Sequence, residues 1–159
     1  MKICALLLSA AAWLAGCSTL TTHVEPNADV GKLRHVFVVQ NLNDNHSLDE
    51  LIVGELRARG LQAESGPLTL MPADAKAYLN YDDRRDPDFT NHLIGLGLML
   101  RQANSDRLLA TANYFRPTAF MRSPDSMIRT AVAALFKSAG RPGASPPAPE
   151  PPRPGEPTR

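Results

Sequence analysis

The first residues impose the strongest constraint on what this chain can fold into. One basic residue, Lys2, precedes a mostly apolar run over residues 3–14, and the small residues Ala15 and Gly16 then stand before Cys17. This order is typical of a secretory signal, which the mature protein loses. The apolar run is much shorter than the ~20 residues that a transmembrane helix needs. We therefore expect residues 1–16 to be a signal peptide and the fold to be made by the chain from Cys17 onward.

The segment Leu14-Ala15-Gly16-Cys17 resembles the lipobox of bacterial lipoproteins. The resemblance implies that the Cys17 thiol is alkylated with diacylglycerol and that a further acyl chain, such as palmitate, is added to the new amine. Two or three acyl chains anchor stably, since each buried methylene contributes about 0.8 kcal/mol. Ser18 stands where an aspartate is the inner-membrane retention signal in many enteric-type bacteria. We expect an outer-membrane anchor with the domain facing the periplasm; cell-surface exposure and an ordinary signal peptide with a chance cysteine are the alternatives.

Cysteine usage and charge limit the chemistry of the mature chain. Cys4 leaves with the signal and Cys17 would be a thioether, so no thiol remains for a disulfide, zinc or a nucleophile. The formal charge is +1, and losing Lys2 makes the mature chain about neutral. Binding to nucleic acid through charge is therefore not expected. About 110 residues lie between the signal and the last part of the chain, enough for one domain held together by packing.

The first part of that domain has the pattern of a strand followed by a helix. Residues 34–40 hold an unbroken apolar run, typical of a strand covered on both faces. Ser47 and Glu50 have the spacing of a capping box at a helix start. Apolar residues then recur at helical spacing, and Gly60 ends the helix. The predicted apolar stripe consists of Leu48, Leu51, Ile52 and Leu56.

The middle of the domain has the pattern of strands. Residues 61–65 and 75–81 are predicted as short strands, the latter with alternating apolar side chains. Residues 92–102 and 108–115 alternate more regularly, and Asn104-Ser105-Asp106 between them marks a turn. These two runs are predicted to form a hairpin.

The last element is a helix followed by a proline-rich tail. Ser123 is placed as an N-cap with Pro124 at the first helical position, and an apolar stripe continues to about Lys137. The domain limits are predicted as 17–33 for a lipidated tether, 34–137 for one α+β domain and 138–159 for a disordered Pro-rich tail. We predict a two-layer α+β fold, with a mixed sheet of four to five strands and two helices on one face.

Several groups of polar residues have the composition of a metal site. Residues 82–88 hold several carboxylates that could bind calcium, but two arginines and the absence of EF-hand spacing favour a solvated loop. The four histidines, which lack metal-ligand spacing, are interpreted as surface residues; they are His23, His35, His46 and His92. No metal site, cofactor or catalytic residue is predicted.

Catalysis by serine or by paired carboxylates is also disfavoured. Ser47 and Ser123 are explained as helix caps, and there is no Gly-x-Ser-x-Gly motif. Asp49 and Glu50, close to Asp44, are interpreted as acids at a helix start and not as a pair that hydrolyses glycans.

Gly95 and Gly97 lie at alternate positions of one predicted strand. They flatten one of its faces, which has two interpretations. A helix packs closely on the glycines, or the glycines form an open, flat face for another protein. The sequence leaves both open.

Four features of the chain together resemble a known group of proteins. They are the lipobox, the capped helix, the stretch Tyr81-Asp82-Asp83-Arg84, and the segment Tyr114-Phe115-Arg116-Pro117 followed by Ser123-Pro124. They are similar to uncharacterised small lipoproteins of Gram-negative bacteria with one compact α/β domain. In outline such domains resemble those of the curli-secretion lipoprotein and of the lipoprotein activators of penicillin-binding proteins. The resemblance covers about residues 34–137 and implies no catalytic residues. The Pro-rich tail departs from it, and the chain is too short for the barrel hairpins of a secretion pore.

We therefore expect a lipid-anchored envelope lipoprotein that acts as a non-catalytic interaction or assembly module. Its expected partners are the membrane, through the lipid on Cys17, and an envelope protein. The first alternative is a periplasmic carrier of a small ligand or lipid, which would need a deep apolar cavity. The second is a cell-wall-related enzyme, which would need convergent polar groups with perturbed pKa values.

Overall fold

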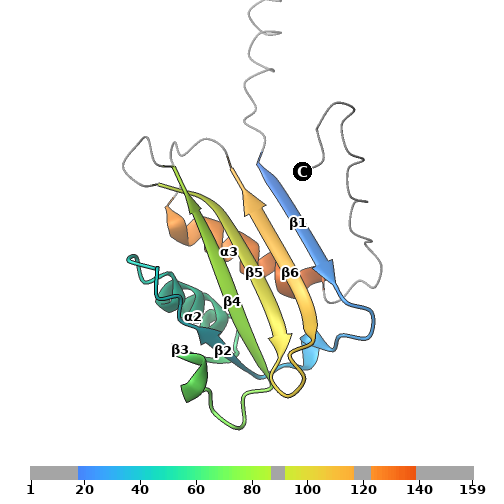
Figure 1. Cartoon of the computed structure of the whole chain (residues 1–159). Helices are drawn as coiled ribbons and strands as arrows, with labels where there is room; N and C mark the ends of the chain where they lie inside the picture. Colours follow the sequence, from blue (N-terminus) through green and yellow to red (C-terminus); the bar gives the residue numbers. More distant parts are fainter. Residues whose placement is uncertain (1–17, 87–91, 117–122, 139–159) are drawn as a thin grey trace, which may run out of the picture.

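One six-stranded mixed sheet with two α-helices makes up the computed structural model, which describes residues 18–86, 92–116 and 123–138 (Figure 1). The strands are β1 (Thr19–Val24), β2 (His35–Val39), β3 (Gln62–Gly66), β4 (Ala77–Arg85), β5 (Leu93–Gln102) and β6 (Leu108–Phe115). The helices are α2 (Leu48–Ala58) and α3 (Pro124–Ser138), with short 3-10 turns at Val30–Lys32 and Leu68–Leu70. The predicted α+β class is confirmed, although the sheet has six strands instead of four or five. Among the described residues, no helix is long and apolar enough to cross a membrane.

The sheet joins a parallel part to an antiparallel part in the order β1-β6-β5-β4-β2-β3. β2 runs parallel to both β3 and β4, and α2 is the crossover between β2 and β3. β4, β5, β6 and β1 are antiparallel neighbours. The predicted hairpin is β5–β6, which confirms the turn signal at residues 104–106.

The strand that the sequence did not predict is β1. The expectation of a tether over residues 17–33 is wrong for the described part of that range, because Thr19–Val24 form a strand that pairs with residues 110–115 of β6. Thr19 lies opposite Phe115 and Val24 lies opposite Ala110. Only Val24 packs against the core, so this edge strand lacks the strong apolar alternation that reveals a strand.

The main core lies between one face of the sheet and both helices. Its fully buried large side chains come from α2, α3 and alternate positions of the central strands. They include Leu48, Ile52, Leu56, Ile128, Leu135, Val36, Val38, Leu79, Leu96, Leu98 and Leu100. Figure 1 shows α2 and α3 behind the same face. The prediction of two helices on one face is confirmed.

Helix α2 begins by a different device from the predicted capping box. Ser47 has a left-handed backbone (φ 54°) and its side chain makes no cap hydrogen bond. Asp44 takes this role, because its Oδ2 accepts the Leu48 amide at 2.6 Å and its Oδ1 accepts the His46 amide at 2.8 Å. The capping-box prediction is therefore wrong, since the conformation of Ser47 does not bring its hydroxyl to the amide of Glu50.

Strand β4 continues through the charged residues that were expected in a solvated loop. Asp82 to Arg85 pair with β5, with a register shift between Arg84 and Arg85. The loop prediction is wrong for residues 82–85, because pairing with β5 satisfies their backbone while alternate side chains still reach solvent. Residues 87 and 88 of that acidic stretch lie outside the described residues.

Candidate functional site: the open face of the sheet

The second face of β1, β6, β5 and β4 lies away from the helices (Figure 1). We call this surface the open face. Its side chains are those that alternate with the buried ones in each strand. They are Thr19, Thr21 and His23; Thr111, Asn113 and Phe115; Gly95, Gly97 and Met99; and Asn80, Asp82 and Arg84. Most are polar and at least partly exposed, so this face is available for binding.

The two glycines lie at the centre of the open face. Leu96 lies between the two glycines and Leu98 follows Gly97. Both leucines point into the core toward the helices, so Gly95 and Gly97 face the opposite way. Helix-on-sheet packing does not explain these glycines. The structure thus favours the other interpretation, in which they flatten an open surface.

Side chains of the neighbouring strands lie close to both glycines. A Cβ at Gly97 would lie 3.1 Å from Asn113 Oδ1, and a Cβ at Gly95 would lie 3.2 Å from Arg84 Cβ and 3.5 Å from Phe115 Cδ2. Gly95 is buried under these two side chains, whereas Gly97 stays partly exposed. At the centre of the face, Gly97 therefore lies beside the side chains of Asn113 and Asp82.

Arg84 and Phe115 meet across Gly95. The Arg84 guanidinium carbon lies 5.6 Å from the centroid of the Phe115 ring, a distance at which a cation is attracted to an aromatic face. Both residues are opposite Gly95 in the register, one on each side. The absence of a side chain at Gly95 lets the arginine reach the ring. An exposed aromatic with a cation over it therefore marks one end of the open face.

The other part of this side of the sheet is covered. Phe37 on β2 and Tyr78 on β4 pack with Ala75, and partly buried Val39 and Met71 join them. The segment before β4 thus covers β2, which confirms the prediction that residues 34–40 form a strand covered on both faces. The open face is therefore limited to the four antiparallel strands.

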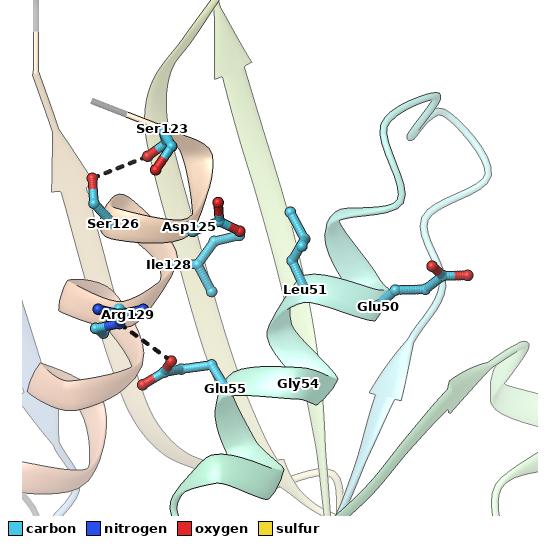
Figure 2. Close-up of a pocket in the computed structure, with 9 residues that line it drawn as sticks. All are labelled: Glu50, Leu51, Gly54, Glu55, Ser123, Asp125, Ser126, Ile128 and Arg129. Carbon is cyan, nitrogen blue, oxygen red and sulfur yellow. Dashed lines mark hydrogen bonds and ion pairs between the residues drawn. The ribbon is translucent and has the colours of Figure 1, made fainter. Parts of the chain in front are cut away.

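A groove lies on the opposite side of the molecule, between α2 and α3 (Figure 2). It has a volume of about 440 Å³ and is lined by Glu50, Leu51, Gly54, Glu55, Ser123, Asp125, Ser126, Ile128 and Arg129. Glu55 is engaged by Arg59 at 3.0 Å and by Arg129 at 3.7 Å. Glu50 and Asp125 belong to first helical turns, where acids complement the helix dipole. The polar lining differs from the deep apolar cavity that a lipid carrier would need.

His35 forms a second polar cluster at the start of β2. Its Nδ1 lies 2.9 Å from Asp74 Oδ2 and its Nε2 lies 3.1 Å from Glu64 Oε1. The hydrogen bond with His35 lowers the pKa of Asp74. These bonds tie β2 to β3 and to the segment before β4, which is a structural task.

Asp44 and Tyr81 form a third polar contact, beside the start of α2. The Tyr81 hydroxyl donates to Asp44 Oδ2 at 2.9 Å. Burial raises the pKa of Asp44, but hydrogen bonds from the His46 amide, Tyr81 and the Leu48 amide, with the Arg85 charge, outweigh burial and lower it overall. Burial is also the largest of the effects that raise the pKa of the Tyr81 hydroxyl. Both groups serve the fold.

The structure disperses most of the other polar residues that the sequence singled out. The four histidines lie apart, with His23 beside Glu25 at 3.0 Å on the edge strand. Within the described ranges, no group of three or more His, Cys, Asp or Glu could hold a metal ion. Asp49 and Glu50 lie in the first turn of α2, which confirms their interpretation as acids at a helix start. Cys17, the predicted lipidation site, lies outside the described residues.

Sequence reasoning missed the Arg84–Phe115 pair. Both residues stand in segments that it had singled out, Tyr81-Asp82-Asp83-Arg84 and Tyr114-Phe115-Arg116-Pro117. The signal that would have linked them is Gly95, which lies between them in the register. That link requires the strand order, which the spacing along the chain does not contain.

The fold is similar to solved structures although no protein-family profile and no curated protein matches this chain. PelC from Paraburkholderia phytofirmans, a dodecamer, is 17% identical with a TM-score of 0.55, over 76% of this chain and 99% of that one. A single-substitution variant of that dodecamer is 18% identical with a TM-score of 0.56, over 76% and 98%. At these identities the likeness concerns the fold alone.

A third similar structure is a PDZ domain protein from Parabacteroides distasonis. It is 14% identical with a TM-score of 0.45, over 87% of this chain and 40% of that one, and this likeness is too weak to carry an argument. These comparisons do not bear on curli secretion or on activation of penicillin-binding proteins. That resemblance therefore stays a prediction.

Proposed function

We propose that this chain is an envelope lipoprotein, anchored in the outer membrane through Cys17, that works as a non-catalytic binding and assembly module. The open face is its binding surface, and further copies of the same chain are the first partners to expect. The observation that carries the proposal is the position of Gly95 and Gly97 on the face away from the helices.

The form of the open face supports binding to a protein. A flat surface of polar side chains fits another folded surface better than it encloses a small molecule. Asn113 and Asp82 beside Gly97 offer hydrogen-bonding groups, and Met99 adds an adaptable apolar contact. The mature chain is about neutral, so its recognition would depend on shape and hydrogen bonds more than on long-range charge.

Self-assembly is supported by the comparison with PelC. Nearly the whole PelC chain is covered by the likeness, and that protein is a dodecamer. A domain of the same fold can therefore be built into a dodecamer. We propose that this chain also associates with copies of itself, and that the lipid anchor gathers those copies on one membrane.

The first test measures the mass of the assembly in solution. The mature chain with Cys17→Ser is purified without lipid and its mass is determined by native mass spectrometry and light scattering. We expect a defined oligomer. Gly97→Arg, which places a long charged side chain at the centre of the open face, is expected to dissociate it.

The matched control is Gly31→Arg, because a Cβ at Gly31 meets nothing within 4 Å and this residue lies outside the sheet. Circular dichroism verifies that both variants are folded. An oligomer that survives Gly97→Arg as well as it survives Gly31→Arg would remove the open face from the proposal. A wild-type chain that stays monomeric at every concentration, and that captures no partner after crosslinking in cells, would refute the binding role.

A further inference from the structure

The sheet begins almost directly at the proposed anchor. Thr19, the first residue of β1, follows Cys17 by two positions. Two residues of chain reach at most about 7 Å, even when fully extended. If Cys17 carries lipid, as the proposed function holds, no spacer separates the sheet from the bilayer.

This short connection limits how far the domain can lie from the membrane. The headgroup layer on each side of the hydrocarbon core is about 5–7 Å thick. A cysteine whose acyl chains lie in the hydrocarbon therefore places Thr19 at or within the outer limit of the headgroups. The start of β1, the end of β6, the start of β5 and the end of β4 all lie at this end of the sheet (Figure 1).

The row of residues across this end has side chains suited to a lipid surface. Thr19, Phe115, Gly95 and Arg84 are successive partners in the register, and we call them the end row; β4 and β5 continue one pair beyond it, at Arg85 and Leu93. Phe115 is 37% exposed, and Leu20, which follows Thr19 and lies on the other face of the sheet beside the end row, is 42% exposed. Arg84 covers the Phe115 ring, and its long side chain can keep its charge among headgroups while its stem contacts apolar surface.

We infer that the end row is a lipid-contacting surface that seats the domain on the membrane with its strands directed away from the bilayer. Phe115 and Leu20 contact the boundary between headgroups and acyl chains. The apolar groups and the short connection supply the contact, so anionic lipid is not required.

The opposite end of the sheet is then held in water. β6 has eight residues, and a strand rises about 3.4 Å per residue, so the β5–β6 turn lies about 25 Å from the end row. Ser105 is an exposed residue of that turn. The inference thus predicts a gradient of lipid contact along β6, from Phe115 through Asn113 to the turn.

The test uses the absence of other thiols in the mature lipoprotein. Single cysteines replace Phe115, Asn113 or Ser105 in the full chain, which is acylated in cells, purified and placed in phosphatidylcholine vesicles. A nitroxide label on each reports collisions with oxygen, which concentrates in lipid, and with a nickel chelate, which stays in water. We expect the oxygen-to-nickel ratio to be several-fold higher at position 115 than at 105, with 113 between them.

A second variant tests the role of the short connection. A flexible Gly-Ser insert of about twelve residues after Ser18 has a root-mean-square span of about 20 Å. It is expected to lower the ratio at position 115 to the value at 105 while the acyl chains keep the protein on the vesicles. Lipid contact that persists despite the insert would refute the short connection as the cause.

Three results separate this inference from the proposed function. Equal ratios at 115 and 105 in a vesicle-bound, acylated protein would overturn the inference and leave the anchor intact. Protection of position 115 from both reagents would also overturn it, by assigning the end row to a protein interface. A chain without acyl groups by mass spectrometry would refute the anchor at Cys17, and the inference with it.

Discussion

Asp44 accepts hydrogen bonds from three groups that the chain brings together at the start of α2. They are the amides of His46 and Leu48 and the hydroxyl of Tyr81. Ser47, the residue that matches the capping consensus, makes no such bond. A cap depends on where the backbone holds the oxygen, and Asp44 is held where three donors converge.

This difference predicts opposite results for two alanine substitutions. Asp44→Ala should lower the free energy of unfolding by about 1–2 kcal/mol, as for the loss of a helix cap. Ser47→Ala should change it by less than about 0.5 kcal/mol, as for a surface residue without a special contact. Urea unfolding of the Cys17→Ser mature chain measures both. A larger loss for Ser47→Ala than for Asp44→Ala would restore the capping box.

The carboxyl of Asp44 also predicts a pH dependence. Its pKa is lowered below the ordinary 3.8 in the folded protein. Its ionised form therefore stabilises the fold above the unfolded-state pKa, and this stabilisation is lost as the pH falls through the folded pKa. The difference in unfolding free energy between wild type and Asp44→Asn should be constant near neutral pH and shrink below 3.8. A difference that grows on acidification would contradict this assignment.

At the scale of elements, the antiparallel strands define the open face, which we propose as the binding surface. The open face exists because α2 and α3 both pack on the other side of the sheet and because the segment before β4 covers only β2 and Tyr78 at the start of β4. Because Gly95 and Gly97 occupy two alternate positions of β5, no side chain projects from the middle of this face at those positions.

The two glycines are predicted to respond differently to alanine. At Gly97 the nearest group is the side-chain oxygen of Asn113, which can rotate away, so Gly97→Ala should be neutral or stabilise by up to about 1 kcal/mol. At Gly95 the nearest group is Arg84 Cβ, which the backbone fixes, so Gly95→Ala should destabilise by about 1 kcal/mol or more. Thermal unfolding of the two variants measures this contrast. Equal effects would show that both sites relax alike.

At the scale of the whole molecule, the described fold ends with α3. The last core contacts come from Leu135, which is fully buried, and from partly buried Phe136. The Pro-rich segment after this helix lies outside the described residues, and its predicted disorder remains a prediction.

Ending the chain after Ser138 should therefore leave the free energy of unfolding within about 0.5 kcal/mol of the full-length value. Ending it after Ala134 removes Leu135 and should cost at least about 2 kcal/mol, as for other losses of a buried leucine. Urea unfolding of the two truncated chains measures these effects. A large loss on removing residues 139–159 alone would mean that the tail packs on the domain.

Local patterns were sufficient for most of the elements. Both helices, the strand at residues 34–40 and the β5–β6 hairpin are visible in the spacing of apolar residues, because each buries one regular face. β1 was not visible, since an edge strand with exposed threonines buries little. The continuation of β4 through Asp82 and Arg84 was not visible either, because charged side chains there face solvent while only the backbone is paired.

The candidate site shows the same division. The sequence identified Gly95 and Gly97 as unusual, because glycine in a strand interior requires a reason. Which face they occupy depends on the side chosen by the helices, and the contact of Arg84 with Phe115 depends on the order β4-β5-β6. Neither property is encoded by spacing within one segment.

By itself, the sequence determined the α+β class, the positions of the helices and the absence of cysteine after Cys17. It also led to Cys17 as the expected lipid site. Only the tertiary structure decided that Asp44 and not Ser47 caps α2, that β1 pairs with β6 at the edge of the sheet, and that the glycines face outward. The physical reason is that local periodicity reports which side chains are buried, whereas strand order and helix side depend on contacts between segments far apart in the chain.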